Sequence, residues 1–219
     1  KAAMKIGFFN SSRSWGGGEK WHLEAAIRLQ RMGETVCICA HPLGVLAQKA
    51  KAQHLPTATF AIHNISWLNP FFFFFLVRFF RQQAFDVVIL NLPSDLKAAG
   101  IAAKQAEIPH IVYRRGSAIP IQNRWHNRFL FKQVITEIIA NSQATKESIL
   151  QKNLNLFPAE KIAVIYNGFD FEAFENLPNQ PIFQRKADEL ILGNAGRLAR
   201  QKGQQDLIDL SLKLQKRNI

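Results

Sequence analysis

A glycine-rich segment near the start of the sequence is suited to binding an anion. Residues 10–20 read NSSRSWGGGEK and lie between an apolar run and a stretch with helical periodicity. Glycines at a strand-to-helix turn let backbone amides approach a negatively charged group, which the helix dipole also favours. Gly16, Gly17 and Gly18 are therefore candidate substrate-binding residues. A flexible turn that only caps the helix is the alternative.

The same region argues against an NAD-dependent enzyme. The loop is long and lacks the GxGxxG spacing of a dinucleotide-binding fingerprint. The next apolar run ends at Ala40 and His41, where an acidic ribose-binding residue would be expected. The sequence contains no Walker motif either.

A second glycine turn carries two cations that could bind a diphosphate. Residues 193–203 read GNAGRLARQKG, and helical periodicity follows them. Arg197 and Lys202 lie five residues apart, so a guanidinium that forks two oxygens stands near a lysine point charge. A solvated basic turn is the alternative for this segment taken alone.

Four segments resemble, in the same order and with similar spacing, motifs of the family-four retaining glycosyltransferases with the GT-B fold. GRLARQKG at residues 196–203 is similar to the donor-binding signature of that family, and GGGE at residues 16–19 to its GGxE loop. IANS at residues 139–142 is similar to its strand–serine–helix segment. VIYNGFD at residues 164–170 resembles its interdomain connection.

The resemblance implies two Rossmann-like domains, of which the second binds a nucleotide-diphosphate sugar and the first the acceptor. It implies that Arg197 and Lys202 are catalytic residues that hold the donor diphosphate. Gly16 and Gly17 would offer amides to it, and Asn167 would bind substrate. It also implies that the reaction retains the sugar configuration and needs neither a metal nor a cofactor besides the nucleotide sugar. The paired glutamates of the family would lie beyond residue 219.

Two arginines follow the fifth apolar run, where many members of that family carry a histidine. The run His110–Tyr113 leads into Arg114 and Arg115. This departure puts a catalytic histidine in doubt and favours an anionic acceptor, such as a phosphorylated sugar or lipid. The alternative is that Arg114 and Arg115 lie in a solvated loop.

The elements that would position these residues alternate between strands and helices. Central runs such as VVIL at residues 87–90 are continuously apolar, which is typical of strands covered on both faces in a parallel sheet. Alternation of this kind predicts βαβ units and an α/β doubly wound, Rossmann-like fold. The expected strands are Lys5–Phe9, Thr35–Ala40, Thr57–Ile62, Asp86–Asn91, His110–Arg114, Glu137–Ala140 and Ile162–Tyr166. The expected helices are Glu19–Met32, Leu43–Gln53, Pro70–Gln83, Ser94–Ala106, Asn123–Val134 and Ser142–Asn153.

The pattern then predicts a domain boundary. Residues 4–170 form the acceptor-side domain, and residues 171–188, with two prolines and no period, form a linker. Residues 189–219 begin a second, donor-binding domain with a strand at Leu190–Ala195 and a helix at Gln204–Arg217. One strand and one helix cannot bury a sheet. We therefore expect the second domain to be truncated here and the chain alone to be inactive.

The segment PFFFFFLVRFFR at residues 70–81 has two interpretations. A helix that is apolar on every side is buried in a core or dips into a membrane interface. Five consecutive phenylalanines cannot all face one side of a helix, and Arg78 and Arg81 suit lipid headgroups. Burial against the sheet and peripheral contact with an anionic membrane therefore both stay open.

The composition limits compartment and partners. A net charge of +12 admits nucleic acid, anionic lipid and phosphorylated substrates as partners. No apolar run is long enough to span a membrane. Cys37 and Cys39 are predicted to be reduced thiols on a strand, and the six histidines form no metal-ligand spacing. We expect a cytoplasmic protein without a metal.

The sequence thus predicts a transferase that uses a nucleotide sugar and a glycan or lipid-linked acceptor. The expected role is the synthesis of lipopolysaccharide, capsule or another polysaccharide of the bacterial cell envelope. Two alternatives remain, a GT-B-fold nucleotide-sugar epimerase and a basic nucleic-acid-binding module. We expect no nucleic-acid partner, because aromatic and basic residues do not interleave in a recognisable binding motif.

Overall fold

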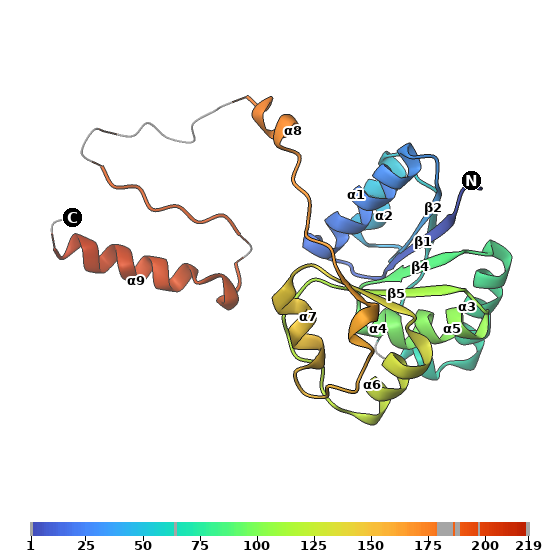
Figure 1. Ribbon diagram of the computed structural model, residues 1–219. Coiled ribbons are helices and arrows are strands. Elements are labelled where there is room, and N and C mark those ends of the chain that lie inside the picture. The colour runs from blue at the N-terminus through green and yellow to red at the C-terminus, as the bar shows by residue number, and fades with distance from the viewer. Residues whose placement is uncertain (1, 64, 179–185, 187–188, 197, 218–219) are drawn as a thin grey trace. The chain divides into compact units, whose positions relative to one another are not determined.

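The computed structural model describes residues 2–63, 65–178, 186, 189–196 and 198–217 (Figure 1). The chain divides into two compact units, Lys1–Gly168 and Phe169–Ile219. The first contains the sheet described below, and the described residues of the second form two α-helices, a 3₁₀ turn and an extended segment.

The first unit is built on a parallel sheet of seven strands, in the order β3-β2-β1-β4-β5-β6-β7. The strands are β1 (Lys5–Asn10), β2 (Thr35–Ala40), β3 (Thr57–Thr59), β4 (Val87–Leu90), β5 (His110–Arg115), β6 (Glu137–Ala140) and β7 (Ile162–Val164). All seven lie where the apolar runs place them, and the predicted doubly wound α/β fold is confirmed.

Helices cover both faces of this sheet (Figure 1). Adjacent residues of β1 point to opposite faces, so that Phe8 packs with α1 and α2 while Phe9 packs with α3 and α5. The helices of this unit are α1 (Gly17–Arg31), α2 (Val45–Ala52), α3 (Pro70–Gln83), α4 (Pro93–Asp95), α5 (Ile101–Gln105), α6 (Trp125–Phe129) and α7 (Gln143–Leu150). Short 3₁₀ turns form at Ser66–Leu68 and Ala159–Lys161.

Three strands are shorter than predicted. β4 loses one residue at each end of the expected Asp86–Asn91, and β3 and β7 end early because a strand ends where its neighbour ends. β3 was expected to reach Ile62, but β2 ends at Ala40, which pairs with Thr59. Phe60 and Ile62 are still buried after they leave the ladder. In the same way β7 stops at Val164, opposite the last residue of β6.

Two predicted helices are interrupted by π-helical turns. Leu96–Gly100 joins α4 to α5, and Leu130–Val134 continues α6. The second of these helices begins at Trp125, two residues later than predicted. Both turns carry buried side chains, so the packing of each helix continues through its turn.

The phenylalanine-rich helix α3 is buried on one face only. Pro70 occupies its first turn, and the Asn69 side chain accepts a hydrogen bond from the backbone amide of Phe72 at 3.2 Å. Leu76, Val77 and Phe80 are buried against the sheet. Phe71 is 84% exposed, and Phe74 and Phe75 are exposed as well. Burial therefore explains only part of the segment.

In the second unit the predicted strand at Leu190–Ala195 is not formed, which corrects that expectation. The segment is extended, but a strand needs a hydrogen-bonded neighbour, and none of the described residues pairs with it. The predicted helix is present as α9 (Gln204–Gln215), with no buried residue. A short helix, α8 (Phe171–Glu175), lies where an aperiodic linker was expected to begin.

Candidate functional site

The candidate site lies at the carboxyl edge of the sheet, where the strand order reverses. From β1 the chain builds outward to β2 and β3, then returns to place β4 on the other side of β1. Open α/β sheets bind ligands in the crevice at this switch point. Asn10 ends β1, Asn91 follows β4, and Arg114 lies near the end of β5.

The glycine segment begins α1 at this edge. Gly16 is the extended N-cap residue, and Gly17 is the first residue of the helix. A Cβ atom on Gly18 would lie 2.5 Å from Nδ2 of Asn91, so only glycine fits there without moving Asn91. A Cβ on Gly17 would meet nothing within 4 Å. The loop therefore approaches β4 closely while Gly17 stays open, as an anion-binding helix N-terminus requires.

Two buried carboxylates hold the loop that connects β1 to α1. Glu19 accepts a hydrogen bond from Nδ2 of Asn10 at 3.1 Å. Asp95 accepts one from the backbone amide of Ser11 at 2.8 Å and another from the Ser11 hydroxyl. Burial raises the pKa of Asp95 to about 6, although both Ser11 bonds oppose that shift. These hydrogen bonds to Asn10 and Ser11 therefore hold the start of the loop in place.

Arg114 is buried at the centre of this edge and is only 4% exposed. Its guanidinium donates to Oδ1 of Asn91 at 3.3 Å and to Oδ1 of Asn167 at 3.2 Å. It also lies 4.8 Å from the ring centroid of Trp21. Burial lowers the pKa of Arg114, and Glu19 opposes the shift. The alternative of a solvated loop is wrong for this residue.

Arg115 is half-buried and points to a different place from Arg114. Its guanidinium donates to the backbone oxygen of Ile119 at 2.7 Å. The strand pleat turns successive side chains to opposite faces, so the two arginines cannot act on one group together. The sequence predicted both as substrate-binding residues. The structure places Arg114 with the glycine loop and Arg115 with the loop after β5.

His22 is a fully buried residue of this region that the sequence did not single out. Its Nδ1 lies 3.0 Å from the backbone oxygen of Gly18, and none of the residues that the structure describes forms a hydrogen bond with its Nε2. Burial lowers the pKa of His22 to about 4, and the charge of Arg114 acts in the same direction. His22 is therefore neutral at physiological pH, and its ring packs edge-on against Phe8.

A groove of about 370 Å³ joins the glycine loop to the end of the first unit. Gly17, Lys20, Trp21 and Arg28 line it from α1, and Tyr166 and Asn167 line it from the segment after β7. The structure thus brings Gly17, Arg114 and Asn167 into one neighbourhood. Their roles in substrate binding stay predictions.

The two predicted catalytic cations lie in the second unit. Arg197 falls outside the described residues. Lys202 ends a 3₁₀ turn, Arg200–Lys202, and is followed by Gly203 in the left-handed conformation (φ 65°), after which α9 begins. The predicted placement of Lys202 just before a helix is confirmed, and its role stays a prediction.

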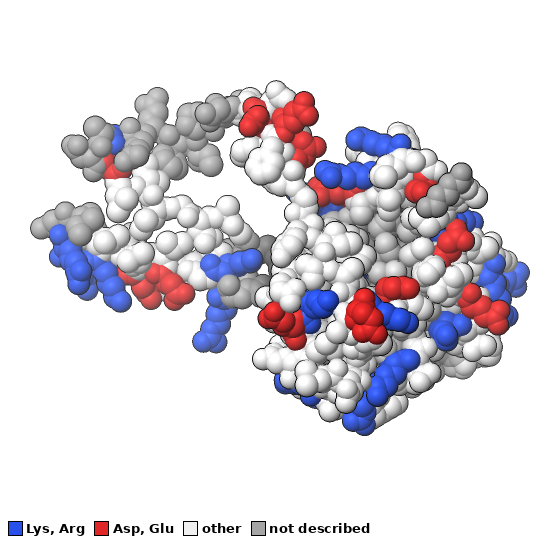
Figure 2. All heavy atoms as spheres, in the orientation of Figure 1, with Lys and Arg blue, Asp and Glu red and all other residues white. Residues whose placement is uncertain are grey.

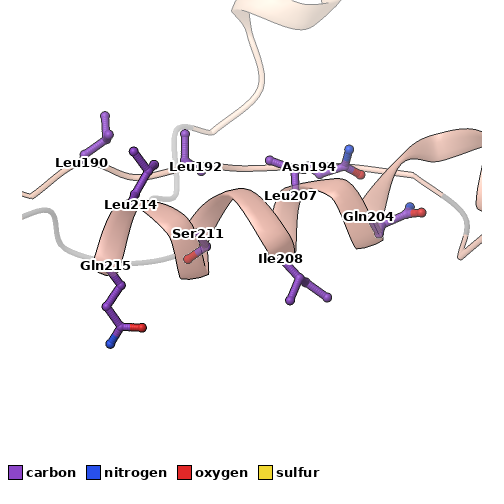
Figure 3. A pocket seen from close by; sticks show the side chains of 9 residues that line it. All are labelled: Leu190, Leu192, Asn194, Gln204, Leu207, Ile208, Ser211, Leu214 and Gln215. Atoms are coloured by element: carbon purple, nitrogen blue, oxygen red, sulfur yellow. The ribbon is translucent and has the colours of Figure 1, made fainter. Parts of the chain in front are cut away.

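A cavity of about 650 Å³ in the second unit does not include Lys202. Figure 3 shows Leu207 and Leu214 of α9 projecting toward the extended segment that carries Leu192 and Asn194, while Ile208 projects to the other side. The lining combines five aliphatic residues with four polar ones. The diphosphate binding predicted for this unit would therefore take place outside this cavity.

Neither a metal-binding cluster nor a membrane-spanning helix occurs among the described residues. No group of three or more histidine, cysteine, aspartate or glutamate side chains could hold a metal ion there. In the same part of the chain, no helix combines the length and apolarity needed to cross a bilayer.

Comparison with known proteins is consistent with this geometry. The model of Glycosyltransferase Family 4 matches residues 15–173. No curated protein matches the chain.

Several solved structures share the fold. Anabaena HepE, solved in complex with UDP and glucose, is 23% identical, with a TM-score of 0.61 over 77% of this chain. The lipopolysaccharide outer core galactosyltransferase WaaB is 18% identical, with a TM-score of 0.57 over 76% of this chain. The chain spans 46% of the length of each. UDP-GlcNAc 2-epimerase from Neisseria meningitidis is 19% identical, with a TM-score of 0.54 over 74% of this chain and 45% of the epimerase.

Proposed function

Since the chain belongs to Glycosyltransferase Family 4, we propose that it provides the acceptor-side domain of an enzyme that transfers a sugar, with retention, from a nucleotide-diphosphate sugar to a glycan or glycolipid. The observation that carries this proposal is the open glycine N-terminus of α1 beside the buried guanidinium of Arg114 at the sheet's switch point. Amides and a fixed cation at this position suit a phosphorylated ligand.

In the proposed chemistry, positive charge stands where the glycosidic bond breaks. The acceptor hydroxyl attacks the anomeric carbon on the same face from which the nucleotide diphosphate leaves with the bonding electrons, and the hydroxyl proton passes to the departing diphosphate. Arg197 and Lys202 stabilise the diphosphate as its negative charge grows, and the amides of Gly16 and Gly17 add to this. The complex of HepE with UDP and glucose supports a nucleotide sugar as donor.

We place the acceptor in the synthesis of the bacterial cell envelope. The likeness in fold to WaaB, a lipopolysaccharide galactosyltransferase, supports this placement. So does the exposed face of α3, because a lipid-linked acceptor would be met at a membrane surface. The proposed location is the cytoplasm, with peripheral contact to the inner face of the plasma membrane.

A nucleotide-sugar epimerase is the second candidate, because UDP-GlcNAc 2-epimerases share the fold. The two activities differ in their need for an acceptor. The enzyme that contains this chain should be incubated with a panel of labelled nucleotide sugars, with and without a lipid extract that supplies the acceptor. Product that appears only with acceptor supports transfer. Conversion of the sugar without acceptor supports epimerisation and overturns the first proposal.

A further inference from the structure

A small pocket lies beside the candidate site, beyond the carboxyl end of β5. Its volume is about 150 Å³, below the roughly 300–1,000 Å³ of pockets that enclose a drug-sized ligand. It therefore suits one small chemical group. Apolar side chains from the α4–α5 region, the loop after β5 and the π-helical turn after α6 form most of its wall. The polar residues that line it are Lys97, Tyr113, Arg115, Gln122 and Asn127.

The pocket is positively charged and lacks a neutralising carboxylate. Residues 108–136, which supply most of its wall, include five lysines and arginines but no aspartate or glutamate. Among the described residues, neither Lys97 nor Arg115 forms an ion pair. Asp95, two residues before Lys97, is buried and hydrogen-bonded to Ser11. Figure 2 shows only Lys and Arg among the visible charges over α6, at the lower end of this unit.

Arg115 is held in place, and one of its hydrogen-bond donors is buried without a partner among the described residues. Its bond to the Ile119 backbone oxygen, 2.7 Å long, fixes one end of the guanidinium. The guanidinium lies 5.9 Å from the ring centroid of Tyr113. Its Nε atom is buried and has no hydrogen-bond partner in the part of the chain that the structure describes. A buried donor without an acceptor is costly, and an anionic ligand oxygen would satisfy it.

We propose that this pocket binds a phosphate group of the acceptor, with Arg115 and Lys97 as its two cations and Asn127 as a neutral donor. This inference rests on the proposed function, because it assigns the pocket to the acceptor. A phosphate presents several oxygens, so it can accept from both cations and from the second amide hydrogen of Asn127, whose Nδ2 also donates to the Gln122 backbone oxygen at 2.7 Å. Ile119, Trp125 and Phe129 are exposed around the same loop and helix, so an alkyl chain on the phosphate would find apolar contacts there.

The test is a titration of this chain, followed by NMR of the arginine Nε–H groups, with no nucleotide sugar present. The probes are inorganic phosphate, glucose 1-phosphate and farnesyl phosphate below its micelle concentration. The Arg115 signal, identified by its loss in Arg115→Lys, should shift on binding. Arg115→Gln and Lys97→Gln should each weaken the affinity about tenfold, as expected for the loss of a charge-assisted hydrogen bond.

Lys132→Gln is the matched control, because Lys132 is an exposed cation of the same stretch but does not line the pocket. If Lys132→Gln weakens the affinity for the probes equally, the binding is nonspecific electrostatic attraction and the proposal is overturned. An Arg115 signal that does not shift with any of the three probes would overturn it too. Tighter binding of farnesyl phosphate than of glucose 1-phosphate supports a lipid source, and the reverse supports a soluble one. A negative binding result does not change the outcome of the transfer assay, and a negative transfer assay does not prevent this binding from being measured.

Discussion

At the scale of single residues, Lys202 and Arg197 carry the prediction most closely tied to catalysis. In the proposed enzyme, alanine at either position should lower kcat/KM by about 10²–10³-fold, since each is proposed to stabilise charge that develops on the leaving diphosphate. The Tm of Lys202→Ala should change little, because Lys202 is an exposed turn residue and such a residue affects stability by only about 0.5 kcal/mol. Arg200→Ala is the internal control, because Arg200 lies between the two in sequence. Equal damage from Arg200→Ala would contradict the assignment.

The glycine loop offers a matched pair of substitutions. Gly18→Ala places a methyl group against the Asn91 side chain, and overpacking of this kind costs about 1–3 kcal/mol. Gly17→Ala meets open space, so the free energy of unfolding should not fall. Urea denaturation of both variants measures the difference. Equal stability of the two variants would mean that the loop does not approach β4 as closely as described.

Two buried titratable groups should oppose each other in the pH dependence of stability. The folded pKa of His22 is lowered to about 4, so the unfolded chain binds the extra proton and stability rises with pH from about 4 to 6.5. The folded pKa of Asp95 is raised to about 6, so the folded chain binds the extra proton and stability falls with pH from about 4 to 6. Each effect is worth about 3 kcal/mol over its window.

Single variants should reveal the two slopes. In His22→Gln, the free energy of unfolding should fall as the pH rises from 4 to 6. In Asp95→Asn, it should rise over the same range, while the wild-type curve is flatter than either. Urea denaturation at half-unit pH steps measures this. Two variants with the same slope would show that one of the groups is not buried as described.

The residues of the candidate site differ in how far the sequence could predict them. The sequence predicted the glycine loop because its glycines are neighbours in the sequence. It predicted Arg114 because this residue comes directly after an apolar run. His22, Asn91 and Asp95 were missed, since a single polar residue gives no periodic signal and its burial depends on elements far apart in the sequence. The glycine four residues before His22 on α1 is the only local hint of its contact.

At the scale of elements, α3 carries a prediction about membranes. Its exposed phenylalanines lie next to Arg78 and Arg81, so the chain should bind anionic liposomes more tightly than neutral ones, and added salt should weaken the preference. Phe71→Ser with Phe74→Ser should lower binding severalfold in a liposome flotation assay. Leu154→Ser is the control, because Leu154 is as exposed but lies outside α3. Unchanged binding of a folded double variant would rule out α3 as the anchor.

The elements also show where prediction from sequence ends. Seven strands were found because buried parallel strands are continuous apolar runs. The ends of β3 and β7 were misplaced, since they are set by the lengths of β2 and β6. The strand expected at Leu190–Ala195 is not formed for the same reason. A strand needs a neighbouring strand to pair with, and no described residue pairs with this segment.

At the scale of the whole molecule, the net charge of +12 is not spread as one basic field. Figure 2 shows Asp and Glu interspersed with Lys and Arg over most of the visible face of the first unit. A groove that tracks a nucleic-acid backbone would instead present a continuous basic surface. The acid-free stretch at residues 108–136 concentrates positive charge beside the candidate site, as a phosphorylated substrate would require.

The last prediction is that the 219-residue chain alone forms no product from nucleotide sugars. Its proposed acceptor side is complete as a folded sheet, whereas Lys202 lies in a unit whose helix α9 has no buried residue. Stabilisation of a leaving diphosphate depends on cations held in place before the reaction, and a helix without packing cannot hold Lys202 in place. Chromatography of labelled nucleotide sugars, incubated with the chain and acceptor, should match the protein-free blank. Turnover above that blank that Lys202→Ala abolishes would show that the second unit orders its cations without burying α9.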